Sequence, residues 1–288
     1  MRVLELFSGL GGWRYALQDQ GSVAAAYDVS ESANATYALN HGDQPKAKEL
    51  ATVPLEELVA HGADTWLMSP PCQPFCRMGN LQGLEDRRSR AFVHLMEVFR
   101  QAPPDHFVLE NVAGFLGSDA HALLRTQVQA HGMHQLELEG CPSRFGLPNR
   151  RPRVFIVASR NPLAPRAPVD LPSSPIGDFL DGEEDDSLYL RPEILSRHWL
   201  GLDLVKPGDH RSACFIGGYG RRFLGSGSFL MTDKGVRRFS PAEVAKLLGL
   251  PGTFRFPAHL SLAGRYRLLG NGLSIPVAAW ALGALQDR

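Results

Sequence analysis

The stretch MRVLELFSGLGGWRYALQDQ, residues 1–20, decides the fold of this chain. RVLELF (residues 2–7) predicts a strand, SGLGG (8–12) a tight turn and WRYALQDQ (13–20) a helix. The glycines of the turn allow a ligand to approach the backbone closely. They do not complete the dinucleotide fingerprint G-x-G-x-x-G, because the third glycine position after Gly9 and Gly11 holds Arg14. By itself the turn indicates a nucleotide site or no site, and it disfavours a nicotinamide enzyme.

The same order of strand and helix recurs along the chain. The predicted pairs are SVAAAYD with ESANATYALN, DTWLM with RAFVHLMEVFR, and HFVLEN with DAHALLRTQVQA, and RVFIVAS (residues 153–159) adds a strand. This alternation predicts an α/β fold with a mostly parallel sheet and helices on both faces. Ligand sites in such sheets lie at the carboxyl ends of the strands.

The alternation stops after Ser159. Residues 161–176 are rich in proline, and DGEEDD (181–186) is an acidic run. Both compositions are typical of a linker or of a solvent-exposed surface segment. Helical order returns at SPAEVAKLLGL (240–250), where Ser240 and Glu243 form a capping box, and GNGLSIPVAAWALGAL (270–285) predicts a final helix. The expected division is a main domain of residues 1–160 and 236–288, with a small insert at 161–235.

Composition narrows the class of protein. The 288 residues are 44% hydrophobic and 21% charged, as in an ordinary globular protein, and the net charge is zero, so a nucleic-acid footprint must be local. We see no secretion signal and no apolar run near the ~20 residues that cross a bilayer, and we expect a cytoplasmic monomer without membrane association. The cysteine spacing provides no second close pair beside Cys72 and Cys76, which predicts that the protein holds no metal.

Cys72 lies in the stiff loop MSPPCQPFC (residues 68–76), after the strand DTWLM. Prolines exclude a continuing strand or helix here. Nucleophilic chemistry requires the thiolate, which nearby arginines would favour; Arg77, Arg87 and Arg88 are the candidates. The alternative is a buried structural cysteine.

Three further positions carry polar chemistry at the ends of predicted strands. Asp28 could accept hydrogen bonds from ribose hydroxyls or cap the next helix. Glu110 follows the apolar HFVL, where burial would raise the carboxyl pKa towards proton donation. The arginines of RRPRVFIV (150–157) could clamp an anion or form a solvated face.

Taken together and in order, five motifs resemble those of the cytosine carbon-5 methyltransferases that use S-adenosylmethionine. They are LELFSGLGGW, PPCQPF, ENV, NRRPR and GNGLSIP, and the resemblance spans the chain except for residues 161–209. LMSPPCQPF, LENVAGF, CFIGGYG with GSGSFLMT, and RYRLLGN are similar to the DNA-methyltransferase-like branch, which methylates a cytosine (cytosine 38) in the anticodon loop of transfer RNA.

The resemblance implies a Rossmann-like catalytic domain, a target-recognition insert and a set of site residues. Its cofactor-binding residues are Phe7, Gly9, Leu10, Gly11, Gly12, Asp28, Leu50, Ser69, Pro70 and Asn271. Its catalytic residues are Cys72, Glu110, Arg151 and Arg153. Asn149 replaces the glutamine of the family's Gln-x-Arg-x-Arg, and Ile216 replaces the threonine expected after Cys214 and Phe215.

The implied reaction needs an unstacked base, because carbon 5 of cytosine reacts only after a nucleophile has added to carbon 6. We therefore expect the anticodon stem-loop of transfer RNA as partner, with DNA as a weaker one. The expected substrate contacts are Arg77, Arg87, Arg88, Cys214, Phe215, Tyr219 as a stacking surface, Arg221 and Arg222. The alternatives are a DNA methyltransferase and, more remotely, a binding protein without catalysis.

Overall fold

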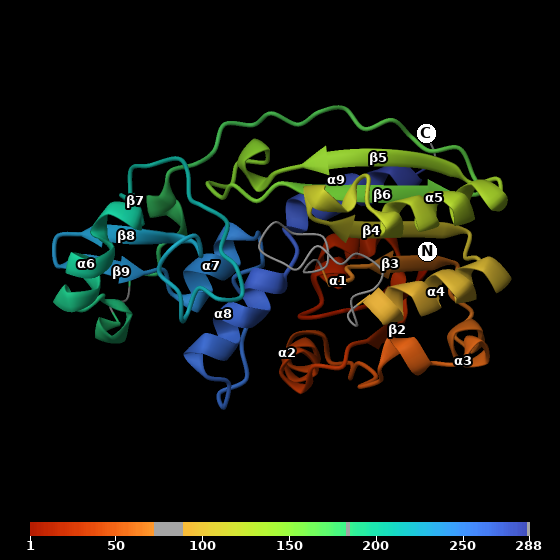
Figure 1. The fold of residues 1–288 in the computed structure, drawn as a ribbon, viewed down its shortest axis with the longest axis horizontal. Coiled ribbons are helices and arrows are strands. Elements are labelled where there is room, and N and C mark those ends of the chain that lie inside the picture. Colours follow the sequence, from red (N-terminus) through yellow and green to blue (C-terminus); the bar gives the residue numbers. More distant parts are fainter. Residues whose placement is uncertain (72–88, 183–184, 287–288) are drawn as a thin grey trace. The chain divides into compact units, whose positions relative to one another are not determined.

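The structure is a computed structural model that describes residues 1–71, 89–182 and 185–286 (Figure 1). The chain forms two compact units. Unit 1 comprises Met1–Gly140, Pro152–Ala167 and Ala278–Arg288, and unit 2 comprises Cys141–Arg151 and Pro168–Val277. These bounds differ from the expected division, because residues 236–277 and 141–151 pack with the segment that follows Pro168. The assignment of catalysis and target recognition to particular segments stays a prediction.

Unit 1 is built on a six-stranded sheet in the order β2-β1-β3-β4-β6-β5. The strands are β1 (Arg2–Leu6), β2 (Ser22–Tyr27), β3 (Thr65–Met68), β4 (His106–Asn111), β5 (His134–Gly140) and β6 (Arg153–Ser159). The first four are mutually parallel, and β6 runs antiparallel to both β4 and β5. The predicted α/β class and mostly parallel sheet are confirmed, whereas β5 was not predicted.

The strand order reverses direction at β1. The chain passes from β1 to β2 on one side and later to β3 on the other, so the switch point lies between the carboxyl ends of β1 and β3. The glycine turn follows β1 at this edge, and the proline loop that leads to Cys72 follows β3. The topology therefore brings the two most unusual loops of the sequence to one place.

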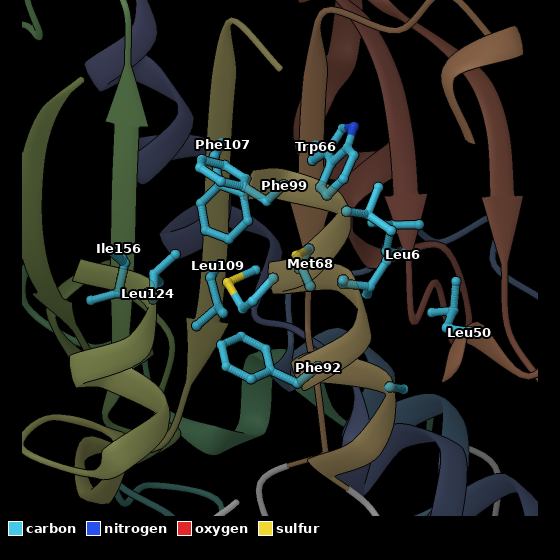
Figure 2. Close-up of a cluster of buried hydrophobic side chains, with 14 of the residues drawn as sticks. Leu6, Leu50, Trp66, Met68, Phe92, Phe99, Phe107, Leu109, Leu124 and Ile156 are labelled. Atoms are coloured by element: carbon cyan, nitrogen blue, oxygen red, sulfur yellow. The ribbon is translucent and has the colours of Figure 1, made fainter. Parts of the chain in front are cut away.

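Helices cover both faces of this sheet. They are α1 (Gly12–Leu17), α2 (Glu31–His41), α3 (Leu55–Ala60), α4 (Arg90–Gln101) and α5 (Asp119–Ala130), and α9 (Ile275–Leu282) begins in unit 2 and ends in unit 1. Figure 2 shows the cluster in which Phe92 and Phe99 of α4 and Leu124 of α5 pack on Met68 and Leu109 of the sheet. On the opposite face, α1 places Trp13 edge-on against Phe155.

Unit 2 holds a three-stranded sheet in the order β7-β8-β9, with β7 parallel and β9 antiparallel to β8. Its elements are β7 (Asp203–Val205), β8 (Ser228–Thr232), β9 (Gly235–Arg238), α6 (Pro192–His198), α7 (Pro241–Leu247) and α8 (Leu262–Asn271). Buried aromatic rings form its core: Phe215, Tyr219, Phe229, Phe239 and Tyr266. The predicted capping box of Ser240 and Glu243 at the start of α7 is confirmed.

Residues Leu262–Leu285, which include α8 and α9, are long and apolar enough to cross a membrane by length and composition alone. The protein buries 67% of the most apolar window of this stretch, as the core helices of globular proteins do.

Candidate active site

The turn after β1 has an unusual backbone. Phe7, Gly9 and Gly11 all adopt positive φ angles, of 58°, 55° and 85°. An added Cβ at Gly9 would meet nothing within 4 Å, whereas one at Gly11 would overlap the imidazole of His41. Gly9 therefore leaves open space for a ligand beside the backbone, and Gly11 is required because another side chain of the protein occupies that position.

His41, the last residue of α2, supports the turn from within unit 1. Its ring lies between Tyr15 and Tyr37, with centroid distances of 4.5 Å and 4.7 Å. Burial, with a smaller contribution from the charge of Arg14, lowers the pKa of His41 to about 4. The ring is therefore neutral at physiological pH and acts as an aromatic plug beneath the turn.

Asp28 connects the end of β2 to the same turn. Its Oδ2 accepts a hydrogen bond from the backbone N–H of Gly9 at 2.9 Å, and its Oδ1 accepts one from Ser30 at 2.8 Å. Burial raises the pKa of Asp28, and these two N–H groups act in the opposite direction. The N-cap of α2 is Ser30, so Asp28 is not the cap itself. A carboxylate in this position can also accept hydrogen bonds from ligand hydroxyls.

The groups at this edge are of the kind that can hold S-adenosylmethionine. Gly9 offers open space, and Ser8 has a buried Oγ that finds no hydrogen-bond partner among the described residues. Asp28 reaches the turn from the neighbouring strand. Leu50, expected beside the adenine, is buried in the hydrophobic cluster of Figure 2, and Asn271 belongs to unit 2. Their roles in the cofactor pocket stay predictions.

Two hydrogen bonds fix the start of the proline loop. Trp13 of α1 donates its Nε1–H to the Oγ of Ser69 at 2.9 Å. Asn111 at the end of β4 donates from Nδ2 to the carbonyl oxygen of Pro70 at 3.3 Å. Cys72, and with it Arg77, Arg87 and Arg88, lies outside the described residues. The segment that leads to Cys72 therefore starts from residues bonded to α1 and to β4.

Glu110 and Arg153 form an ion pair at the same edge, with 3.0 Å between Arg153 Nε and Glu110 Oε1. Glu110 is the penultimate residue of β4 and is 8% exposed, and Arg153 begins the antiparallel strand β6. Because β4 and β6 run in opposite directions, the last residues of one meet the first of the other. The guanidinium therefore holds the carboxyl group in one orientation. Two residues far apart in the sequence are brought together, as expected of partners in one site.

Arg151 has a different environment from Arg153. It is buried in unit 2, where Nη1 donates to the carbonyl oxygen of Phe215 at 3.1 Å and Nη2 donates to those of Gly270 and Gly272 at 3.0 Å and 2.7 Å. These bonds satisfy carbonyl groups at the end of α8 and link them to the segment around Phe215. They give Arg151 a structural role, and its predicted catalytic role stays a prediction.

The expected substrate contacts separate into buried and exposed residues. Tyr219 is 0% exposed, donates to the carbonyl oxygen of Ser228 at 2.6 Å and accepts from the N–H of Phe239, so its prediction as a stacking surface is wrong. Phe215 is likewise buried in the aromatic core of unit 2. Arg221 and Arg222 are exposed, as phosphate contacts need to be.

Cys214 and Cys141 are free thiols. The sulfur of Cys214 accepts a hydrogen bond from Arg151 Nη1 at 3.3 Å. Among residues 1–71, 89–182 and 185–286, His, Cys, Asp and Glu side chains form no cluster of three that could hold a metal ion.

Trp13, Asn111 and Glu5 were not predicted as residues of this site. Glu5 lies in the middle of β1, and its Oε2 accepts a hydrogen bond from the Tyr37 hydroxyl at 2.9 Å. Burial raises the pKa of Glu5 to about 7, against the opposing effects of Tyr37 and of Arg14. A charged residue within the apolar run VLEL was the available signal.

Comparison with known proteins agrees with this geometry. A tRNA (cytosine(38)-C(5))-methyltransferase of Homo sapiens is 31% identical, with 97% of each chain covered. A DNA (cytosine-5)-methyltransferase of Dictyostelium discoideum is 28% identical over 99% of this chain and 94% of its own. The crystal structure of the Schizosaccharomyces pombe Dnmt2 methyltransferase superposes with a TM-score of 0.90 at 30% identity, covering 99% of this chain and 98% of that one.

The family model of the C-5 cytosine-specific DNA methylases matches residues 1–188 and 207–286. The turn after β1, the anchored proline loop and the Glu110–Arg153 pair all lie within the matched ranges. The chain therefore belongs to the C-5 cytosine-specific DNA methylase family.

Proposed function

We propose that this protein is a tRNA (cytosine-5-)-methyltransferase that modifies cytosine 38 in the anticodon loop. The observation that carries the proposal is the match, over nearly the whole of both chains, to relatives named for that activity. The buried Glu110–Arg153 pair beside the anchored proline loop supports it, because a binding protein without catalysis has no need of this arrangement.

In the proposed reaction, the thiolate of Cys72 adds to carbon 6 of the cytosine. Glu110, oriented by Arg153, protonates or hydrogen-bonds ring nitrogen 3, so that electron density moves to carbon 5. S-adenosylmethionine supplies the methyl group when bound. Loss of the proton from carbon 5 then restores the double bond and expels Cys72 as thiolate.

The anchors of the proline loop support this chemistry. The thiolate must meet one face of a planar base, and a displacement of about 1 Å costs on the order of a hundredfold in rate. Hydrogen bonds at Ser69 and Pro70 fix the start of the loop, and the prolines limit its backbone freedom beyond.

The substrate is the point on which relatives differ. Most of the relatives compared carry a transfer-RNA name, and the Dictyostelium discoideum protein carries a DNA name. A base in a loop is already unpaired, so extracting it costs less than flipping a base from a duplex. Duplex DNA therefore remains the second candidate substrate. Monomeric state, cytoplasmic location and absence of membrane binding are further parts of the proposal.

The test is transfer of labelled methyl from S-adenosylmethionine to total transfer RNA and, separately, to duplex DNA. We expect label in transfer RNA, lost in Cys72→Ala and reduced by at least a hundredfold in Glu110→Gln. Label in duplex DNA alone would overturn the choice of substrate, and full activity of Cys72→Ala would overturn the covalent mechanism.

A further inference from the structure

Unit 2 exposes large apolar side chains that the proposed reaction does not explain. Trp199 is 47% exposed, Leu200 is 100% exposed and Leu224 is 51% exposed. Single exposed hydrophobic residues are ordinary, but neighbouring ones mark a contact surface.

The two segments that carry these side chains pack on each other. The His198 ring stacks on the Phe223 ring, with centroids 5.3 Å apart and planes 18° apart. A Cβ at Gly201 would lie 2.7 Å from Cδ2 of Leu224, so the segment after α6 packs directly on residues 223–224. We call the surface of Trp199, Leu200 and Leu224, with His198 and Phe223 beneath, the α6 patch.

The base of the α6 patch is well held. The Arg238 guanidinium lies over the Phe223 ring, 4.9 Å from its centroid, and Arg238 Nε donates to the carbonyl oxygen of Tyr219. Phe223 also stacks with Phe229 of β8. Because the base of the α6 patch is already ordered, binding a ligand there costs the protein little conformational entropy.

Positive charge flanks the α6 patch. Arg197, Arg221 and Arg222 are exposed, and within the part of the chain that the structure describes none of them has a carboxylate partner. SRHWLG (196–201) and GYGRRFLGSG (218–227) contain no acidic residue. Asp203, which follows the first segment, is paired with Arg211 and accepts a hydrogen bond from Ser228.

An exposed tryptophan beside uncompensated arginines suits RNA with accessible bases. A stacked duplex hides the faces of its bases, whereas unpaired nucleotides present both a ring for stacking and a nearby phosphate. We propose that the α6 patch binds nucleotides of the RNA substrate other than the target cytosine, with an unpaired base on Trp199 and phosphates at Arg221 and Arg222. This inference rests on the proposed function and adds to it a second place of contact.

Binding of unmodified transfer RNA, followed by fluorescence anisotropy at several salt concentrations, tests the inference. Trp199→Ala should raise Kd by about tenfold, since stacking contributes ~1–3 kcal/mol per base, and Trp199→Phe should restore much of the affinity. Arg221→Ala/Arg222→Ala should lower the salt slope by about 1.4, since each phosphate contact contributes ~0.7. The control is Leu39→Ala on α2, which removes a side chain of similar exposure (54%) from unit 1 and should change neither value.

Methyl-transfer kinetics of the same variants distinguish failure of this inference from failure of the proposed function. The inference predicts that Trp199→Ala raises KM for transfer RNA and leaves kcat within about twofold. If the wild type methylates transfer RNA and Trp199→Ala binds it as tightly, the patch is refuted and the proposed function stands. If the wild type neither binds nor methylates transfer RNA, both are refuted. Self-association of the wild type that Trp199→Ala abolishes, with RNA binding unchanged, would assign the patch to a second copy of the chain.

Discussion

At the scale of single residues, Gly11 and Gly42 illustrate two different reasons why a position requires glycine. Both adopt positive φ, 85° and 79°, but a Cβ at Gly42 meets nothing within 4 Å whereas one at Gly11 overlaps His41. Gly42→Ala should therefore cost about 1 kcal/mol of unfolding free energy, from backbone strain alone. Gly11→Ala should cost about 2–4 kcal/mol of unfolding free energy. It should also weaken S-adenosylmethionine binding, because either the turn or the His41 ring must move to make room for the Cβ.

The double variant Gly11→Ala/His41→Ala provides the control. Removing the ring should recover part of the loss in cofactor affinity measured by calorimetry. Equal effects of Gly11→Ala and Gly42→Ala on both stability and binding would show that His41 does not support the turn.

Glu5 should make stability depend on pH. Its pKa is about 7 in the folded protein, above the ordinary 4.5, so the folded state binds more protons between these values. The stabilisation is fully present below about pH 4.5 and is lost as pH rises to about 7, by on the order of 3 kcal/mol in total. Relative to wild type, Glu5→Gln should therefore gain stability across this window.

Urea unfolding at pH 5, 6, 7 and 8 measures this difference. Glu139→Gln, at an exposed position on β5, is the matched control and should show almost no change across the series. A difference between Glu5→Gln and wild type that stays constant from pH 5 to 8 would contradict a neutral buried carboxyl.

At the scale of elements, α7 depends on a buried ion pair that the sequence did not reveal. Glu243 accepts from Arg237 Nη1 and Nη2 at 2.8 Å and 2.7 Å and also from the N–H of Ser240 at 2.7 Å. Glu243→Ala leaves the Arg237 charge buried and should cost about 3–5 kcal/mol. Ser240→Ala, which removes the cap and the hydrogen bond from Ser240 Oγ to Asp181 Oδ2 but leaves the ion pair, should cost about 1–2 kcal/mol. Similar chemical unfolding midpoints for the two variants would show that the pair contributes little.

Most elements with a marked apolar pattern were predicted from the sequence. The strands β1 to β4 are mainly apolar runs before helices, so their parallel arrangement was predicted, whereas their order in the sheet was not. β5 is an edge strand whose QLELE alternates polar and apolar residues, and this signal of a half-buried strand was overlooked. β7 to β9 have only three to five residues each, and strands this short bury too few side chains to leave a clear pattern.

The residues of the candidate site that lie at the ends of strands could be predicted from the sequence. Glu110 and Arg153 were expected in one site, and the antiparallel pairing of β4 and β6 brings them together. The environment of Arg151 could not be foreseen, because its partners are backbone carbonyls that lie 64 to 121 residues away, and its catalytic role stays a prediction. Tyr219 was misread because an aromatic ring among glycines looks the same whether it is exposed or buried.

At the scale of the whole molecule, the chain combines a sheet unit that holds the candidate chemistry with a second unit that exposes cationic and aromatic side chains. Each compact unit includes segments distant in sequence, so the first-to-last order of motifs does not give the division of the chain. Membership of the C-5 cytosine-specific DNA methylase family fixes the type of reaction.

Covalent trapping tests the central claim most directly. An anticodon stem-loop RNA with 5-fluorocytidine at position 38 blocks loss of the group at carbon 5, so the enzyme cannot be released after methyl transfer. With S-adenosylmethionine present, the account predicts a denaturant-resistant complex whose mass equals protein plus methylated RNA, linked at Cys72 and absent in Cys72→Ala. A complex formed only with fluorinated duplex DNA, or one that persists in Cys72→Ala, would contradict the account.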